Sequence, residues 1–210
     1  MKENLFKDFG LVFCNGVPPS RRRLDSVLAA PKFVACADGG ANIALDLGYV
    51  PDIVIGDLDS FRIPQFEIPR MRVVKIATQE NTDLEKTIDF LTGEKENRFM
   101  ITAFSGGRID HTLANLQIAY ECTDHCNIIL VDEEYVIYPV RSDLNLELPE
   151  KTLVSIIPME DDTIISSRGL KYELKHEYLR RGGRGISNSL SEDVLKLKVH
   201  RGGAFLFVRE

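Results

Sequence analysis

Hydrophobic runs alternate with helix-like stretches along the first two thirds of the chain. Short apolar runs are typical of buried strands, and most of them are followed by apolar positions at helical spacing. The runs fall at residues 11–14, 33–37, 53–55, 72–76, 98–104 and 127–131, and helices are predicted near 20–28, 41–47, 82–93 and 110–122. This alternation predicts a mostly parallel sheet with helices on both faces.

Local signals place the ends of several of these helices. Ser20 and Thr82 stand at positions where a hydroxyl oxygen accepts a hydrogen bond from a free backbone N–H of the first turn. Gly48 and Gly93 follow the last apolar positions and are predicted to end their helices.

The pattern changes near residue 135. Short alternating runs, separated by Pro, Gly, Asn and Asp, lie at residues 135–138, 144–148, 153–157, 163–165, 194–199 and 204–208. They predict a small antiparallel β-sandwich. We therefore expect an α/β protein with two domains, 1–134 and 135–210. Because the second domain is too small for a large core of its own, we expect it to pack on the first or on a partner chain.

Composition and charge narrow the function. The chain is 44% hydrophobic and 28% charged, with a net charge of −6. A negative chain lacks the basic footprint of a duplex nucleic-acid binder, and no apolar run is long enough to span a membrane. We expect neither kind of partner. Four cysteines and a charged start without a secretion signal favour a reducing, cytoplasmic location.

The segment Ile55-Gly56-Asp57-Leu58-Asp59-Ser60 carries the clearest chemical signal. Asp57 and Asp59 follow a predicted buried strand, and residues two apart at a strand end point to the same side. Two hard carboxylate ligands facing one point suit Mg²⁺, which keeps several waters and binds phosphates. Taken alone, an Asp-x-Asp pair also fits a solvated turn.

Further polar and glycine-rich turns follow the other predicted strands. Since the carboxyl ends of parallel strands share one edge of a sheet, these turns are expected to gather on one rim. Candidate nucleotide-binding residues on this rim are Asn15, Gly16, Asp38, Gly39, Gly40, Thr82, Lys86, Ser105, Gly106, Gly107, Arg108 and His111. A ligand outside the strand ends is therefore predicted.

If the ligand takes part in phosphoryl transfer, several rim residues have expected roles. Asp83 is interpreted either as a third metal ligand or only as a favourable charge at a helix N-terminus. Lys86 is interpreted either as a phosphate ligand or as a solvated helix lysine. Arg108 offers a planar fork after an anion-binding glycine turn, or belongs to a plain turn. Asp110 orients a ligand or caps the next helix, and Asn115 lies one turn further along that helix.

The common nucleotide-binding fingerprints are missing from the sequence. There is neither a Gly-x-x-x-x-Gly-Lys-Ser/Thr loop nor a Gly-x-Gly-x-x-Gly turn after the first strand. A metal-dependent glycosyltransferase, a haloacid-type phosphatase and a non-catalytic sensor that binds a nucleotide or another small ligand are the alternatives. The phosphatase fits less well because its Asp-x-Asp follows the first strand, whereas here it follows the third.

The ordered set of motifs resembles the thiamine pyrophosphokinase family, which moves a pyrophosphoryl group from ATP to thiamine. The matching segments are Asp38-Gly39-Gly40-Ala41, Gly56 to Ser60, Thr82-Asp83 with Lys86, Gly106 to His111 with Asn115, Gly169 to Leu174, Gly185 to Asn188 and Gly203 to Arg209. The resemblance covers nearly the whole chain. It implies an N-terminal catalytic α/β domain and a C-terminal β-sandwich that binds thiamine and forms a homodimer.

The resemblance also implies residue roles. Asp57, Asp59 and Asp83 are expected to bind Mg²⁺ and the phosphates of ATP, with Arg108 and Asp110 near the reacting groups. Candidate substrate-binding residues are Asn115, Ser187 and Asn188, the last two from the β domain of the partner chain. Without the resemblance, Ser187-Asn188 is interpreted as a turn. Because the chain has no tryptophan, any aromatic stacking on the substrate comes from Tyr or Phe.

Overall fold

A computed structural model describes the chain except residues 1–5, 29, 63–67, 69 and 210. The chain divides into two compact units, Met1–Glu133 and Glu134–Glu210. Each unit is described by itself below.

The first unit contains a parallel sheet in the order β6-β5-β1-β2-β3-β4. Its strands are β1 (Gly10–Phe13), β2 (Val34–Ala37), β3 (Ile53–Gly56), β4 (Arg72–Lys75), β5 (Arg98–Thr102) and β6 (Asn127–Val131). The chain starts at β1, runs outward to β4, and then returns to place β5 beside β1. The strand order therefore reverses between β1 and β5, where open α/β sheets bind ligands.

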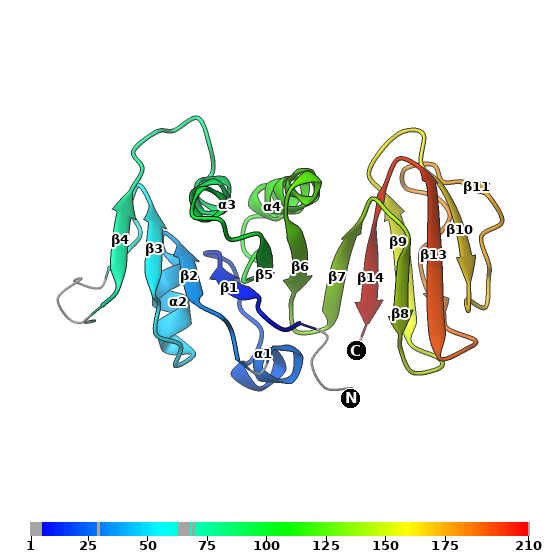
Figure 1. The fold of residues 1–210 in the computed structure, drawn as a ribbon, viewed down its shortest axis with the longest axis horizontal. Helices are drawn as coiled ribbons and strands as arrows, with labels where there is room; N and C mark the ends of the chain where they lie inside the picture. The colour runs from blue at the N-terminus through cyan, green and yellow to red at the C-terminus, as the bar shows by residue number, and fades with distance from the viewer. Residues whose placement is uncertain (1–5, 29, 63–67, 69, 210) are drawn as a thin grey trace. The chain divides into compact units, whose positions relative to one another are not determined.

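The helices cover both faces of this sheet, as predicted. They are α1 (Arg21–Val27), α2 (Gly40–Asp46), α3 (Asp83–Gly93) and α4 (Ile109–Glu121), followed by the 3-10 helix η2 (Cys122–Asp124). In Figure 1, α3 and α4 lie side by side on one face, and α1 and α2 lie on the other. Strands β1, β2 and β3 are buried along their whole length, which explains their continuous apolar sequences.

Two of the predicted helix caps are confirmed. The hydroxyl of Ser20 accepts from the backbone N–H of Arg23, and that of Thr82 accepts from Glu85. The alternative that Asp110 caps α4 is wrong. Arg108 occupies the cap position without a side-chain cap, and Asp110 lies within the first turn of the helix.

The second unit is antiparallel and forms two sheets, in the orders β12-β9-β14-β7 and β11-β10-β13-β8. The strands are β7 (Tyr135–Val140), β8 (Leu144–Glu147), β9 (Leu153–Pro158), β10 (Ile164–Arg168), β11 (Glu177–Tyr178), β12 (Asn188–Ser189), β13 (Val194–Arg201) and β14 (Ala204–Arg209). The predicted α/β class with an additional antiparallel β unit is confirmed.

The sequence did not predict β11 and β12, because two-residue strands carry no periodicity. The interpretation of Ser187-Asn188 as a turn holds for half of the pair. Ser187 has a positive φ of 57°, whereas Asn188 begins β12.

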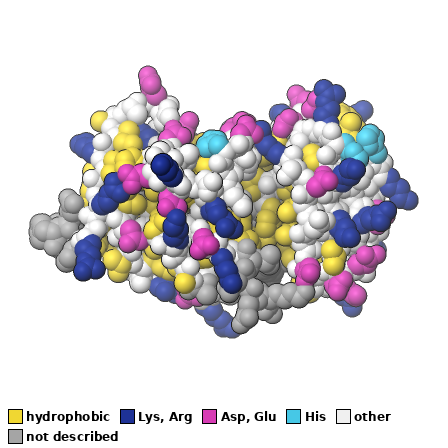
Figure 2. All heavy atoms as spheres, viewed as in Figure 1, with side chains coloured by type: hydrophobic (Ala, Val, Ile, Leu, Met, Phe, Trp, Pro, Cys, Tyr) yellow, Lys and Arg dark blue, Asp and Glu magenta, His cyan; other side chains and the backbone are white. Residues whose placement is uncertain are grey.

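The surface charges and the helix lengths concern the expectation that the protein binds neither a nucleic acid nor a membrane. Figure 2 shows side chains of both charge signs interspersed over the visible face of each unit. Among the described residues, no helix combines the length and the apolar character needed to cross a bilayer.

Candidate active site

A cleft of about 990 Å³ opens at the carboxyl ends of the strands of the first unit. Most of the residues predicted for this rim line it: Asn15, Gly16, Asp38, Asp57, Asp59, Thr82, Asp83, Lys86, Gly106, Gly107, Arg108, Asp110, His111 and Asn115. Three predicted residues, Gly39, Gly40 and Ser105, are not among the lining residues. The structure therefore gathers segments from along the first unit into one cleft.

Two loops meet at the switch point between β1 and β5. The backbone N–H of Gly16 donates to the carbonyl of Ala103 at 2.7 Å, and that of Val17 donates to Ser105 at 2.7 Å. A side chain at position 16 would lie only 2.3 Å from the Ser105 carbonyl oxygen, so only glycine fits. In the later glycine turn, Gly107 has a φ of 70° and open space beside it, whereas a Cβ added at Gly106 would lie 2.5 Å from Cγ2 of Val17.

Asp57 and Asp59 lie close together, but for a different reason from the one predicted. Strand β3 ends at Gly56, so both carboxylates belong to the loop after it. Between them, Leu58 adopts a left-handed φ of 68°, and the N–H of Asp59 donates to the Asp57 carboxylate at 3.2 Å. This tight local turn, rather than strand alternation, brings the pair together.

A third carboxylate joins this pair. One carboxylate oxygen from each of Asp38, Asp57 and Asp59 lies within 4.8 Å of the others. Asp38 is only 3% exposed, and its Oδ2 accepts from the N–H of Ser60 at 3.1 Å. Its Oδ1 is buried and has no hydrogen-bond partner among the described residues. Burial raises the pKa of Asp38. A buried carboxylate with one oxygen lacking a described partner therefore stands beside the half-buried Asp57 and the exposed Asp59.

Asp83, the third predicted metal ligand, is engaged with a lysine. Its Oδ1 lies 2.9 Å from Nζ of Lys86, one turn along α3. Lys86 is buried, so the alternative of a solvated helix lysine is wrong. Gly56 permits this arrangement, because an added Cβ there would lie 2.9 Å from Cβ of Asp38 and 3.2 Å from Oδ1 of Asp83. The two acidic side chains thus approach the end of β3 closely.

Gln79 is a cleft residue that the sequence did not predict. Its Nε2 donates to Oδ2 of Asp57 at 3.0 Å, and this bond is the main reason why the pKa of Asp57 is lowered. Ser60 and Asn81 also line the cleft and were not predicted as site residues. Gln79 follows β4 in a segment without a recognisable motif, so its contact with Asp57 was not visible in the sequence.

Arg108 and Asp110 form an ion pair at the cleft, and both are largely exposed. The fork of Arg108 spans the carboxylate, with Nε donating to Oδ1 at 3.1 Å. This hydrogen bond lowers the pKa of Asp110 to about 2. Asn115 also lines the cleft, and its Nδ2 donates to the carbonyl of Phe104 at 2.8 Å, which fixes the loop after β5.

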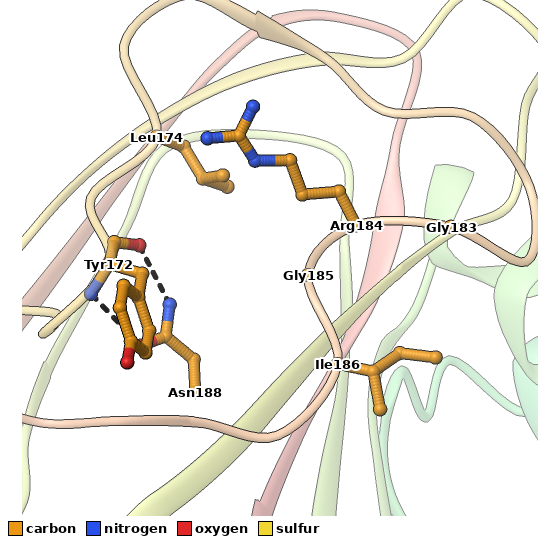
Figure 3. A pocket seen from close by; sticks show the side chains of 7 residues that line it. All are labelled: Tyr172, Leu174, Gly183, Arg184, Gly185, Ile186 and Asn188. Atoms are coloured by element: carbon orange, nitrogen blue, oxygen red, sulfur yellow. Dashed lines mark hydrogen bonds between the residues drawn. The ribbon is translucent and has the colours of Figure 1, made fainter.

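The second unit has a separate pocket of about 270 Å³ (Figure 3). It is lined by Tyr172, Leu174, Gly183, Arg184, Gly185, Ile186 and Asn188. Of the two residues predicted here, Asn188 lines the pocket and Ser187 does not. The N–H of Ser187 donates to Oγ of Ser155 in β9 at 3.0 Å.

The cleft combines hard oxygen ligands, a buried lysine and glycine turns beside a parallel sheet, and these features together define a phosphoryl-transfer class of α/β protein. Comparison with known families identifies the member of that class. The thiamin pyrophosphokinase catalytic domain matches residues 24–131, and the thiamin pyrophosphokinase vitamin B1 binding domain matches residues 139–202. The chain belongs to the thiamine pyrophosphokinase family, as its motifs predicted.

Individual relatives agree with this assignment. The chain is 29% identical over 205 residues to thiamin pyrophosphokinase 1 of Caenorhabditis elegans, covering 89% of this chain and 84% of the relative. It is 28% identical over 190 residues to thiamine pyrophosphokinase of Bacillus subtilis, covering 82% and 81%.

Solved structures show the same fold. The crystal structure of thiamine pyrophosphokinase from Bacillus subtilis superposes with a TM-score of 0.83 at 23% identity, covering 97% of this chain and 99% of that one. Thiamin pyrophosphokinase from Candida albicans gives 0.83 at 15% identity, covering 96% and 88%. The function of the family is ATP-dependent transfer of a pyrophosphoryl group to thiamine, which yields thiamine diphosphate.

Proposed function

We propose that this chain transfers the pyrophosphoryl group of ATP to the hydroxyl of thiamine with the help of Mg²⁺, giving thiamine diphosphate and AMP. The hydroxyl oxygen attacks the β-phosphorus, and the bond from that phosphorus to the α–β bridging oxygen breaks. The observation that carries this proposal is the acidic cluster of Asp38, Asp57 and Asp59 in the same cleft as the buried Lys86.

The donor set fits a hard divalent cation. Three carboxylates converge, and the buried Oδ1 of Asp38 has no partner among the described residues. Mg²⁺ bound there would neutralise charge on the phosphate oxygens. In our proposal Asp57 and Asp59 hold the metal, and Asp83 contributes an oxygen as the resemblance implied.

The remaining cleft residues bind the nucleotide. Lys86 directs a buried ammonium toward the phosphates, while the amides of Gly106 and Gly107 offer donors in a turn that lines the cleft. Asp110 accepts hydrogen bonds from the guanidinium of Arg108, and the planar fork of that group also suits phosphate oxygens. His111 and the Asn15-Gly16 loop line the same cleft and complete the nucleotide side.

Thiamine is expected in the pocket of the second unit. We propose that a homodimer brings this pocket to the nucleotide-binding cleft. The pocket carries exposed apolar side chains, Tyr172 and Ile186, and Ile109 and Leu113 are exposed one turn apart on α4 beside the cleft. Apolar surface of this kind marks contact sites. In the proposed dimer, the β unit of one chain covers the cleft of the other.

A product assay tests the function. Purified protein is incubated with ATP, thiamine and Mg²⁺, and the nucleotide product is separated by chromatography. AMP together with thiamine diphosphate supports the proposal. ADP indicates an ordinary kinase, and the absence of both products indicates a sensor that binds without turnover.

We also propose that the protein works in the cytoplasm. Cys14, Cys36, Cys122 and Cys126 are all free and buried, which suits a reducing compartment.

A further inference from the structure

A side-chain amide takes the place of backbone pairing at the edge of the thiamine pocket. Leu170 forms an antiparallel bridge with Leu190. In that register Tyr172 lies opposite Asn188. The main chain of Asn188 is already paired with Val154 of β9, so it is directed away from the Tyr172 segment.

The side chain of Asn188 supplies the missing bonds. The N–H of Tyr172 donates to Oδ1 of Asn188 at 3.1 Å, and Nδ2 of Asn188 donates to the carbonyl of Tyr172 at 2.7 Å. This two-point contact imitates a peptide group and continues the ladder by one residue. Figure 3 shows both bonds as dashed lines.

These bonds leave Asn188 little capacity for a substrate. Its Oδ1 also accepts from the N–H of Ser189 at 2.9 Å, so both lone pairs of the oxygen are used. The residue is only 6% exposed. Tyr172 differs from Asn188, because its backbone is fixed by these bonds although the residue as a whole is 64% exposed at the pocket.

We propose that Asn188 is a positioning residue that acts through Tyr172, rather than a ligand of thiamine. Fixing the backbone of Tyr172 sets its ring as one wall of the pocket, across from the 183–186 segment. An aromatic, positively charged substrate gains from stacking on a tyrosine face, and a wall fixed in advance loses less entropy on binding. This inference rests on the proposed function, which brings thiamine to this pocket.

A set of substitutions tests the inference through the KM for thiamine. In Asn188→Asp the size is kept, but an acceptor replaces the donor that faces the Tyr172 carbonyl. Tyr172→Ala removes the wall at an exposed position, where folding is least affected. Each variant is expected to raise the KM for thiamine about tenfold and to leave the KM for ATP within about twofold.

The double variant separates positioning from direct contact. If Asn188 acts through Tyr172, adding Asn188→Asp to Tyr172→Ala leaves the KM for thiamine where Tyr172→Ala alone puts it. If Asn188 binds thiamine directly, the two effects multiply, and the inference is wrong. An unchanged KM for thiamine in Tyr172→Ala also overturns it, whether or not the Asn188 variant folds.

A matched control accounts for general damage to the β unit. Thr163 is also buried, and its hydroxyl donates to the carbonyl of Gly203 at 2.9 Å. Neither residue lines the pocket. Thr163→Val is expected to lower thermal stability without changing either KM. If this variant raises the KM for thiamine as much as Asn188→Asp does, the effect is structural and the inference fails. Failure of the proposed function would appear separately, as wild-type protein that forms no AMP.

Discussion

Nζ of Lys86 lies 2.9 Å from Oδ1 of Asp83, and while the lysine side chain is only 4% exposed, that of the aspartate is 33% exposed. The two charges therefore differ in how much they depend on each other. The ammonium has little access to water, whereas the carboxylate retains some.

This asymmetry predicts unequal stability effects. Asp83→Asn leaves a buried ammonium unpaired and should cost about 3–5 kcal/mol of unfolding free energy. Lys86→Met keeps the buried volume and leaves a partly hydrated carboxylate, so it should cost clearly less. Urea unfolding of both variants measures the difference. Equal losses would show that the pair is not the source of the stability.

Asp59→Asn tests the metal assignment. We expect a loss of roughly 10²-fold or more in kcat at saturating Mg²⁺, because a ligand that supports the phosphate charge is removed. The fold should survive, since Asp59 lies in an exposed loop after β3. The control is Asp89→Asn, an exposed carboxylate on α3 that does not line the cleft. Near-normal turnover in the Asp59 variant would remove it from the metal site.

Asp38→Asn should raise the free energy of unfolding and weaken metal binding. Within the described part of the wild-type chain, the buried Oδ1 of Asp38 has no hydrogen-bond partner, so removing the charge should stabilise the metal-free protein by about 1–3 kcal/mol at neutral pH. The same change should weaken the binding of Mn²⁺, which replaces Mg²⁺ in this test because its binding can be followed by electron paramagnetic resonance. A variant that is less stable and binds Mn²⁺ normally would place Asp38 in the fold alone.

Arg108→Lys should lose most of the activity although it keeps the charge, because an ammonium cannot reproduce a two-point fork. A variant with full activity and ATP affinity would make Arg108 a surface residue.

The same arginine sets the titration of Asp110. Arg108 depresses the pKa of Asp110 to about 2 in the folded protein, whereas the pKa of an aspartate in the unfolded chain is about 3.9. The pair therefore stabilises the fold fully at a pH above about 3.9, and this stability is lost as the pH falls toward 2. Arg108→Ala should raise that pKa toward about 3.9, measured by NMR titration. An unchanged pKa would mean that other groups hold it low.

Mixing two damaged chains tests the shared site. Asp59→Asn impairs the cleft, and Tyr172→Ala impairs the pocket at limiting thiamine. If each site uses the cleft of one chain and the pocket of the other, a mixed dimer has one site with both lesions and one intact, so activity should return to about half. If each chain holds its own complete site, subunit exchange restores nothing. A monomer by sedimentation would also contradict the dimer.

Local sequence determined much of this protein. The buried strands appeared as apolar runs, and the hydroxyls of Ser20 and Thr82 marked helix starts, because these features depend on residues within one turn or strand. The motif order was specific enough to indicate the family. The glycine and aspartate turns indicated the rim, because parallel strands must end on a common edge.

Tertiary structure alone decided the rest. Three contacts join residues 16 to 22 positions apart in the sequence. They are the contact of Asp38 with the Asp57 loop, the hydrogen bond from Gln79 to Asp57 and the hydrogen bonds between Asn188 and Tyr172. Such contacts depend on strand order and loop conformation, including left-handed residues such as Leu58 that no periodicity signals. The same limit applied to Lys86, since one helical position looks equally suited to solvent or interior until the neighbouring strands are placed.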